Sequence, residues 1–357
     1  MNYKHILITG GAGFVGSNIA MQLRNLYSTI DITVLDNLKR RGSELSISRL
    51  TDQNIKFVHG DIRNKEDFEG VGTYDLMIEC SAEPSVLAGV NESPEYLLNT
   101  NLVGAVNCFE SCRNNASDII FLSTSRVYPI NSLNNIDFKE SDTRFDIMPN
   151  QKIQGLSENG ISEDFLLNGA RSLYGATKLS SEIILQEYFD IYGIKGVINR
   201  CGVITGPWQM GKIDQGVIVL WIARHIWKDK PLSYIGYGGT GKQVRDFIHI
   251  DDLFNVVHTQ IKDMDRYTGE TFNIGGGLEN SLSLFELTKL CEKMSGNHIE
   301  IKKELKDRPN DVRIYLSDTS KFQKKSDWKC QHNAEKTISD IYRWIIENKS
   351  VLERILN

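Results

Sequence analysis

HILITGGAGFVGSNIA, residues 5–20, is the stretch that decides the fold of this chain. Its aliphatic start predicts a short buried strand, and Gly10, Gly13 and Gly16 follow at intervals of three residues as a helical pattern begins. Glycines at such a turn let backbone N–H groups approach a phosphate at the positive end of a helix dipole. The stretch therefore predicts a strand, a phosphate-binding turn and a helix in direct succession.

Apolar strands continue to alternate with helix-length segments through the first half of the chain. The further predicted strands are 31–36, 55–61, 75–82, 118–124 and 196–203. Strands that are apolar on both sides need cover on both faces, which is typical of a parallel sheet between two layers of helices. We therefore predict an α/β fold with a doubly wound parallel Rossmann sheet.

A smaller second lobe is expected toward the C-terminus. A chain of 357 residues is long for one core, and the loops GPWQMGK (206–212) and GYGGTGKQ (236–243) loosen the pattern after about residue 205. We predict a Rossmann domain over 1–204 and a mainly substrate-binding α+β lobe over 205–357. Some later segments are expected to return to the Rossmann sheet.

The composition of the chain indicates which kinds of partner it binds and where in the cell it is located. The chain has 40% hydrophobic and 24% charged residues and a formal net charge of -5, without the basic excess of nucleic-acid-binding proteins. The N-terminus enters a strand pattern at once, and no run of about 18 apolar residues occurs. We expect no nucleic-acid or membrane partner and a cytoplasmic location.

The cysteines and histidines do not suggest a metal site. The seven histidines are dispersed, and the six cysteines lack the close pairs of a zinc site. We predict free thiols and no bound metal. The cysteines are Cys80, Cys108, Cys112, Cys201, Cys291 and Cys330.

Asp36, at the end of the second predicted strand, completes the pattern of a dinucleotide-binding site. A carboxylate there accepts a hydrogen bond from a ribose 2′-hydroxyl and repels the 2′-phosphate of NADP, which favours NAD. The basic run 39–41 keeps NADP open as an alternative. Asp61 and Ile62, after the third predicted strand, are expected to border the adenine, with a simple strand-end turn as the alternative.

The segment SLYGATK, residues 172–178, sets Tyr174 and Lys178 four residues apart. On a helix these positions share a face, and a nearby ammonium lowers the pKa of a phenol, so the pair can serve as a proton acceptor and donor. The same spacing also occurs on solvated helices without function. The surrounding motifs decide between the two interpretations.

The glycine turn, Thr124 at the end of FLSTSRVY and the later Tyr-x-x-x-Lys together resemble the short-chain dehydrogenase/reductase superfamily. The chain is similar, over nearly its full length, to the extended branch of nucleotide-sugar epimerases and dehydratases. The resemblance implies that Thr124 bonds the reacting sugar oxygen and that Tyr174 exchanges a proton with a sugar hydroxyl. It also implies that Lys178 lowers the pKa of Tyr174 and holds the nicotinamide ribose.

The resemblance carries further residues over to the two ligands. For the cofactor these are Phe14, Val15, Asn37, Ser81, Ala82, Asn101 and Arg200. For the substrate they are Ser125, Arg126, Arg245, Arg308 and Asp311, of which Arg245 and Arg308 suit phosphate oxygens. A solvated salt bridge is the alternative for Arg245 and Arg308.

Two positions depart from the family pattern. Glu79, in MIECSAEPSV (77–86), stands where many relatives have a histidine. Val203, in RCGVITGP (200–207), stands where many 4-epimerases have an asparagine. Both departures concern the contacts to the cofactor and to the substrate diphosphate.

The two residues after Thr124 bear on which reaction of this branch the chain catalyses. Dehydratases carry an Asp-Glu pair there, whereas this chain has Ser125 and Arg126, and net reductases usually draw on NADP. An epimerase fits best, and segments 206–221 and 241–287 resemble the CDP-paratose 2-epimerase (CDP-tyvelose epimerase) family. The long connection from Thr124 to Tyr174, which lies 50 positions further along the chain, also suits that family.

The resemblance to the 2-epimerases implies NAD-dependent inversion of C2 of a CDP-hexose through a transient keto sugar. Gln209, Asp214 and Gln215 are then candidate sugar contacts. A UDP-sugar 4-epimerase, a 4,6-dehydratase or reductase, and a regulatory NAD-binding protein remain alternatives. The branch also implies a homodimer formed by helices near 101–114 and 174–192, with apolar residues Ile183, Ile184, Tyr188 and Ile191.

Overall fold

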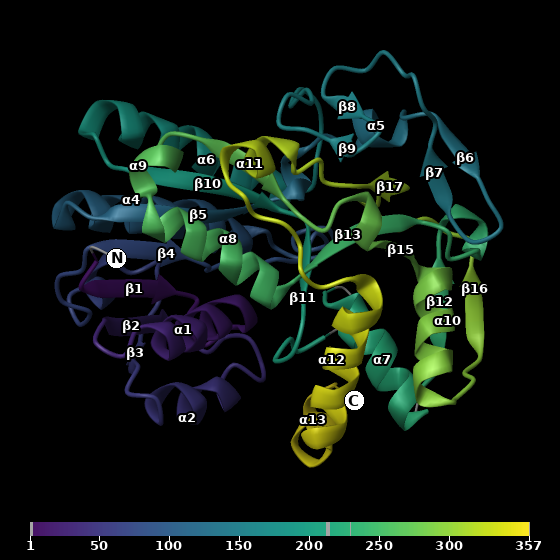
Figure 1. The fold of residues 1–357 in the computed structure, drawn as a ribbon, viewed down its shortest axis with the longest axis horizontal. Helices are drawn as coiled ribbons and strands as arrows, with labels where there is room; N and C mark the ends of the chain where they lie inside the picture. The colour runs from purple at the N-terminus through teal and green to yellow at the C-terminus, as the bar shows by residue number, and fades with distance from the viewer. Residues whose placement is uncertain (1–2, 212–214, 229, 357) are drawn as a thin grey trace. The chain divides into compact units, whose positions relative to one another are not determined.

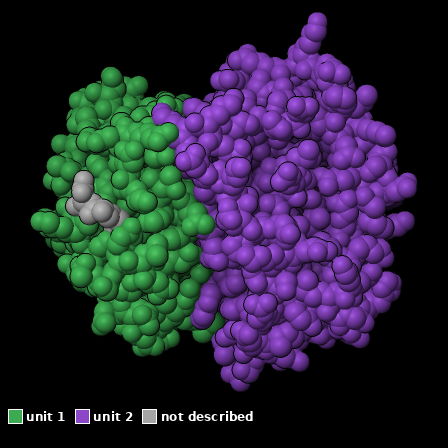
Figure 2. Space-filling view, in the orientation of Figure 1, with its two compact units in different colours: residues 1–124, 173–200, 254–272 green, residues 125–172, 201–253, 273–357 purple. Residues whose placement is uncertain are grey.

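The computed structural model describes residues 3–211, 215–228 and 230–356 (Figure 1). The chain divides into two compact units, shown in green and purple in Figure 2. Unit 1 contains Met1–Thr124, Leu173–Arg200 and Phe254–Phe272. Unit 2 contains Ser125–Ser172, Cys201–Leu253 and Asn273–Asn357. Each unit is therefore assembled from three separate segments of the chain.

A seven-stranded sheet in the order β14-β10-β5-β4-β1-β2-β3 forms the centre of the Rossmann-like fold. The pairs β1–β2, β2–β3, β1–β4 and β4–β5 are all parallel, so the predicted doubly wound sheet is confirmed. The strands are β1 (His5–Thr9), β2 (Asp31–Asp36), β3 (Lys56–His59), β4 (Leu76–Glu79), β5 (Asp118–Thr124), β10 (Gly196–Cys201) and β14 (Thr271–Ile274).

One predicted strand is divided in the structure. We predicted a continuous strand over 196–203, but β10 ends at Cys201 and Val203–Thr205 forms β11 in a different sheet. Gly202 separates the two, and its N–H donates to the carbonyl oxygen of Ile274 at 2.7 Å. A glycine, with no side chain to pack, is a natural point for a strand to change direction.

Two helices, α4 (Gly104–Asn115) and α6 (Leu173–Tyr192), cover one face of the sheet and also pack against each other. Leu7, Met77 and Phe121 point to this face and form one buried cluster with the two helices. Because side chains alternate along a strand, Ile6 and Ile8 point to the other face, and both are fully buried as well. Each such side chain stabilises the fold by about 1.5–3 kcal/mol.

Helix α1 (Phe14–Leu26) follows β1 directly and packs against β1 and β2. Tyr27 follows α1, and its hydroxyl lies 2.6 Å from Nε2 of His258 on α8 (Ile250–Lys262). The shorter helices of unit 1 are η1 (Lys65–Phe68), α2 (Leu45–Thr51), α3 (Glu95–Leu98), the π-helical turn η2 (Asn99–Val103) and α9 (Met264–Tyr267).

Unit 2 has a mixed sheet built around β13 (Val244–His249). Strand β13 pairs in parallel with β11 and with β17 (Ile314–Tyr315), and antiparallel with β15 (Ser281–Ser283). The other strands in the described part of unit 2 form three two-stranded sheets. These are β6 (Phe138–Glu140) with β7 (Phe145–Ile147), β8 (Leu156–Ser157) with β9 (Gly160–Ile161), and β12 (Leu232–Ile235) with β16 (Ile301–Glu304).

Three longer helices of unit 2, α7 (Val217–Trp227), α10 (Leu284–Ser295) and α12 (Ala334–Glu347), pack against one another. A capping box starts α10, because Ser283 Oγ accepts from the N–H of Glu286 while the Glu286 carboxylate accepts from the N–H of Ser283. The other helices are η3 (Ser125–Val127), α5 (Ile130–Asn134), η4 (Tyr237–Gly239), η5 (Leu278–Asn280), α11 (Ser320–Lys325) and α13 (Lys349–Leu356).

Candidate functional site

The turn between β1 and α1 leaves no room for a side chain at Gly10, Gly11 or Gly16, and a Cβ on Gly11 would lie 2.3 Å from Cβ of Val34. Gly10 has a φ of 62°, and a Cβ there would lie 2.9 Å from the backbone of Cys80 and Ser81. A Cβ on Gly16 would lie 2.5 Å from the carbonyl oxygen of Gly10. The turn is closed by the N–H of Gly13, which donates to that same oxygen at 3.1 Å. The backbone is thus left open to a close-fitting ligand.

The N-terminus of α1 suits an anion. The helix begins with Phe14 and Val15, both half-buried, and its first turn, described in full, carries no acidic side chain. Backbone N–H groups at such a terminus carry a partial positive charge and attract phosphate oxygens. The glycine turn and this terminus therefore fit the pyrophosphate of a dinucleotide.

Asp36 closes the same region from the end of β2. Its carboxylate accepts hydrogen bonds from the N–H of Ala12 at 3.0 Å and from the N–H of Leu38 at 2.8 Å. Burial raises the pKa of Asp36, and these two N–H groups oppose the rise. Asp36 thus ties the end of β2 to the glycine turn, at the strand edge where a ribose would be expected.

A second acidic group lies beside the first. Asp61 accepts a hydrogen bond from Asn37 Nδ2 at 2.8 Å and pairs with Arg63 at 2.6 Å. Burial would raise the pKa of Asp61, but the hydrogen bonds from Arg63 and Asn37 lower it to about 2. Ile62 is only 6% exposed and packs in the cluster beneath α4. The guanidinium of Arg63 also stacks over the Tyr96 ring at 4.8 Å, a contact that was not predicted from the sequence.

Asn101 holds the segment after β4. Its amide accepts from the N–H of Glu83 at 2.7 Å and donates to the carbonyl oxygen of Glu83 at 3.0 Å, fixing the backbone just beyond Ser81 and Ala82. Asn101 sits in the π-helical turn η2, and its own carbonyl oxygen accepts from the hydroxyl of Ser181. Single π turns are frequent at functional sites, and no residue pattern in the sequence predicted this one.

Lys178 is the most buried of the predicted catalytic side chains. It and Tyr174 both lie on α6, and Lys178 is 2% exposed whereas Tyr174 is half-buried. The ammonium lies 3.4 Å from the carboxylate of Glu79 and 4.0 Å from the centre of the Phe121 ring. The Lys178 side chain is therefore not solvated.

Thr124 ends β5, the strand that α6 packs against, and is 7% exposed. The hydroxyl of the preceding Ser123 donates to the carboxylate of Glu182, one helical turn beyond Lys178. Arg200 pairs with the same carboxylate at 2.8 Å. The structure thus gives Arg200, predicted near the cofactor, a buried carboxylate as its partner. Glu182 was not predicted from the sequence because its two partners are remote in the chain.

Unit 2 contains a pocket with about 410 Å³ of empty volume, part of it open to solvent. Three residues predicted to contact substrate line it, namely Ser125, Arg126 and Arg245, as does the unexpected Val203. Its other lining residues are Tyr128, Ile130, Leu133, Ser172, Asn310, Val312 and Tyr315. These were not predicted from the sequence, although Tyr128 belongs to the STSRVY segment.

The remaining predicted substrate residues are placed unevenly. Asp311 pairs with Arg245 at 2.7 Å, and Arg308 is half-buried. Gln209 is bonded to β11, accepting from Thr205 Oγ1 and donating to the carbonyl oxygen of Ile204, both at 2.9 Å. Within the described part of the chain, none of these three lines the pocket, nor does the half-buried Gln215. Asp214 lies outside the described residues.

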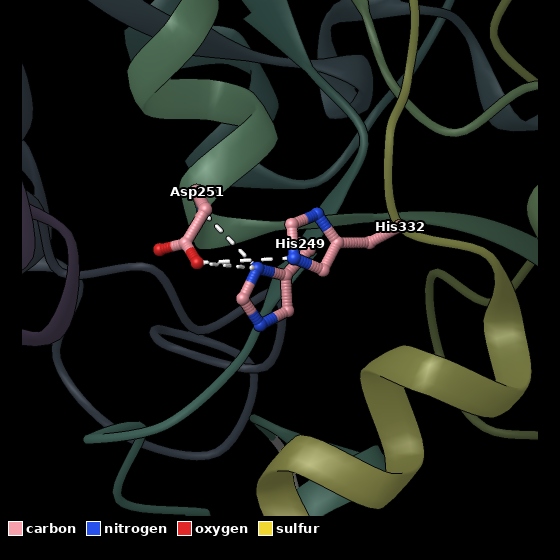
Figure 3. Close-up of side chains that lie close together, drawn as sticks. All are labelled: His249, Asp251 and His332. Carbon is pink, nitrogen blue, oxygen red and sulfur yellow. Dashed lines mark hydrogen bonds and ion pairs between the residues drawn. The ribbon is translucent and has the colours of Figure 1, made fainter.

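His249, Asp251 and His332 form a cluster in unit 2 that could be considered for a metal (Figure 3). Oδ2 of Asp251 lies 3.5 Å from Nδ1 of His249 and 3.8 Å from Nε2 of His332. The two imidazoles are stacked, however, with centroids 4.1 Å apart and planes at 14°. Because a metal binds in the plane of an imidazole, an ion in the plane of one ring would lie over the face of the other. The stacked arrangement does not fit shared coordination.

None of the helices in the described parts of the chain is long and apolar enough to cross a membrane. All six cysteines carry free thiols, as predicted.

Comparison with known proteins gives the geometry its family context. Residues 6–275 match the model of the NAD dependent epimerase/dehydratase family. The chain is 31% identical to CDP-paratose 2-epimerase of Salmonella typhi, over 95% of this chain and 98% of the relative. It is 26% identical to dTDP-glucose 4,6-dehydratase of Escherichia coli, over 98% and 95%.

A solved structure agrees with these sequences. UDP-glucuronic acid 4-epimerase of Bacillus cereus, in complex with UDP-glucuronic acid and NAD, superposes with a TM-score of 0.78 at 25% identity, over 96% of this chain and 99% of that one. The region that matches the family model includes both the glycine turn and α6. The chain belongs to the NAD dependent epimerase/dehydratase family, and its cofactor is NAD.

Proposed function

We propose that this protein is a nucleotide-sugar epimerase that inverts C2 of a CDP-hexose through a transient 2-keto sugar. The observation that carries the catalytic assignment is the burial of Lys178 on the same helix face as Tyr174, with Thr124 ending the strand on which that helix packs. A buried, fixed ammonium favours the ionised form of a neighbouring phenol, as a general base requires.

In the proposed reaction, Tyr174 removes the proton from the hydroxyl of the carbon to be inverted. Thr124 donates a hydrogen bond to the same sugar oxygen and holds it toward Tyr174. Bound NAD would accept a hydride from the sugar and later return it, so the reaction consumes no external oxidant or reductant. When the ketone has turned its other face, Tyr174 returns the proton and the inverted alcohol is released.

The pocket of unit 2 supports a nucleotide diphosphate as the binding handle. Arg126 and Arg245 supply guanidinium groups that suit phosphate oxygens, and Ile130 and Val312 supply apolar walls. The chain also links this pocket to the catalytic residues, since Ser125 directly follows Thr124. We assign the diphosphate of the substrate to this pocket.

The choice of C2 rests on two supports. The Salmonella typhi relative at 31% identity is a 2-epimerase, and Val203 lines the pocket where many 4-epimerases have asparagine. A side chain that cannot hydrogen-bond the diphosphate would let the sugar sit in a shifted position, and the carbon nearest the nicotinamide would change with it. The cytidine base is inferred from the same relative.

A UDP-sugar 4-epimerase is the principal alternative, given the similarity to the Bacillus cereus 4-epimerase. The 4,6-dehydratase alternative is weaker because Ser125 and Arg126, rather than two acids, follow Thr124. A regulatory protein that binds NAD without turnover would retain the fold but would have no need of Thr124 and Tyr174 together with Lys178.

The test is to incubate the protein with a panel of CDP- and UDP-hexoses and follow the sugar stereochemistry by NMR. We expect inversion at C2 of a CDP-hexose without added NADH, and a primary kinetic isotope effect from deuterium at C2 but not at C4. An isotope effect from C4 alone would establish the 4-epimerase alternative. A requirement for stoichiometric NADH or NADPH would exclude an epimerase.

We also propose that the protein is a homodimer in the cytoplasm. Ile183 and Ile191 on α6 are 54% and 62% exposed, which is unusual for isoleucine and suits burial against a second copy. Ile184 and Tyr188, expected on the same surface, instead pack partly against the cluster of their own subunit. The six free thiols are consistent with a reducing compartment.

A further inference from the structure

Glu79 lies in the cofactor region, at the end of β4, and takes no part in the proposed reaction. It is 1% exposed, and burying a carboxylate is costly unless it is paired. Its two oxygens face different donors. Oε2 lies 3.4 Å from the ammonium of Lys178, and Oε1 accepts from the N–H of Ser81 at 2.8 Å. Glu79 therefore joins the end of β4 to the catalytic helix.

We propose that Glu79 is a positioning residue that fixes the Lys178 ammonium and partly offsets its charge, so that Tyr174 ionises at a higher pH than it would beside an uncompensated lysine. The proposal deepens the proposed function, since Tyr174 is its acid and base. Glu79 departs from the pattern that the resemblance implies, and its carboxylate faces the Lys178 ammonium.

The pair is held from several sides. The Phe121 ring of β5 lies under the ammonium with its centre 4.0 Å away, and a desolvated ammonium is attracted to such a ring. Lys178 is 2% exposed, so its stem has little freedom. In this low-dielectric setting, a charge on Glu79 acts strongly on neighbouring groups.

The other ionisable groups around the pair do not replace Glu79. Burial raises the pKa of Cys108 on α4 well above its usual range, so this thiol stays neutral. Glu182, one turn further along α6, is neutralised by Arg200 at 2.8 Å. Burial raises the pKa of Glu79 itself, while Lys178 and the N–H of Ser81 oppose the rise. Each oxygen of Glu79 faces a donor, the Lys178 ammonium at 3.4 Å and the N–H of Ser81 at 2.8 Å, as expected for a paired carboxylate.

The sign of the effect follows from these charges. A positive charge near Tyr174 stabilises the phenolate, and a negative charge behind that positive charge weakens the stabilisation. Replacing Glu79 by a neutral residue should therefore lower the pKa of Tyr174. The expected shift is about one pH unit, at the lower end of the roughly 1–3 units that a charge in direct contact produces, because Glu79 acts through Lys178.

The test measures Tyr174 directly, without any substrate. The ultraviolet absorbance of tyrosinate is titrated in each protein and in the same protein with Tyr174→Phe, and the difference isolates Tyr174. We expect Glu79→Gln and Glu79→His to lower its pKa by about one unit, and Glu79→Asp, which keeps the charge but withdraws it from Lys178, to lower it by less. Glu187→Gln, on an exposed position of α6, should change nothing.

The outcomes separate the inference from the proposed function. An unchanged Tyr174 titration in every folded Glu79 variant overturns the inference, and Glu79→Asp preserves the charge so that at least one variant folds. If the titration moves but the acidic limb of the pH profile of turnover does not move with it, Glu79 acts as inferred and Tyr174 is not the catalytic base. If both move together to lower pH, the inference and the role of Tyr174 are both supported.

Discussion

The carboxylate of Glu182 lies 2.8 Å from the guanidinium of Arg200, with both side chains almost completely buried. Ser123 donates its hydroxyl to the same carboxylate. The three residues come from α6, β10 and β5, so this one buried charge pair fixes the catalytic helix to two strands. The position of Thr124, the next residue of β5, depends on it.

Removing one member of this pair should be strongly destabilising. Glu182→Gln leaves the Arg200 guanidinium buried without a countercharge, and we expect a loss of about 3–5 kcal/mol in the free energy of unfolding. Urea denaturation followed by circular dichroism would measure it. Asp265→Asn, which breaks the exposed pair with Lys195, is the control and should cost no more than about 1 kcal/mol. Equal losses in both variants would contradict a structural role for Glu182.

Gly16→Ala should impair binding of NAD. The new Cβ would lie 2.5 Å from the carbonyl oxygen of Gly10, so the turn to which we assign the pyrophosphate must change its shape. We expect affinity for NAD, measured by calorimetry, to fall at least about tenfold, because displacing a packed backbone costs about 1–3 kcal/mol. Gly70→Ala adds a Cβ whose nearest neighbour is 3.7 Å away and should leave affinity unchanged. Unaltered affinity of Gly16→Ala for NAD would contradict the assignment of the pyrophosphate to the glycine turn.

Tyr174→Phe should separate catalysis from binding. The substitution removes the hydroxyl that exchanges the proton and keeps the ring, so turnover should fall by about 10² to 10⁴-fold while NAD affinity and unfolding stay close to normal. Tyr192→Phe, at the end of the same helix and 51% exposed, is the matched control. Near-normal turnover in Tyr174→Phe would remove Tyr174 from its role.

The oligomeric state can be tested on the exposed apolar positions of α6. We expect the unmodified protein to have the mass of a dimer at micromolar concentration in light scattering. Ile183→Glu and Ile191→Glu place charges in the proposed interface and should shift the mass to that of a monomer. Val351→Glu, on the exposed side of α13, should have no effect. A monomeric unmodified protein would rule out the homodimer.

The Rossmann strands could be predicted from the sequence because each is a short apolar run between helical patterns, which is a local signal. The pairing of Lys178 with Glu79, 99 residues away, could not be predicted, because that contact exists only once β4 and α6 are packed. The hairpin of β6 and β7 also escaped prediction. Its three-residue strands carry too few alternations to stand out from a loop, and it is fixed by packing of Phe138 and Phe145 against the core of unit 2.

Val203 shows a second limit of prediction from sequence, which concerns where a side chain lies. Its departure from the family pattern was visible in the sequence, but its place in the wall of the unit 2 pocket was not. The sequence likewise could not show that the amide of Gln209, a predicted substrate residue, is hydrogen-bonded to β11. A motif identifies which residues to consider, whereas the direction of each side chain depends on the surrounding strands.

Asp246 on β13 should make the stability of the protein depend on pH. It is fully buried, and its carboxylate accepts from the N–H of Gly277 at 3.1 Å. Burial raises the pKa of Asp246 from its usual 3.8 to about 6, even though hydrogen bonds to the carboxylate oppose the rise. Between these two values the folded protein keeps a proton that the unfolded chain has released.

The folded state therefore binds one more proton than the unfolded state in this window, and the free energy of unfolding falls as the pH rises through it. The slope is about 1.4 kcal/mol per pH unit, or about 3 kcal/mol in total, and it vanishes above about pH 6 where both states are ionised. Asp246→Asn has nearly the same shape, can still accept from Gly277 and cannot ionise. Urea denaturation of both proteins from about pH 4 to about pH 7 isolates this group, because every other acidic residue cancels in the difference. We expect the stability of the unmodified protein relative to Asp246→Asn to decline across the window, and a constant difference would show that Asp246 ionises in the folded protein as readily as in the unfolded chain.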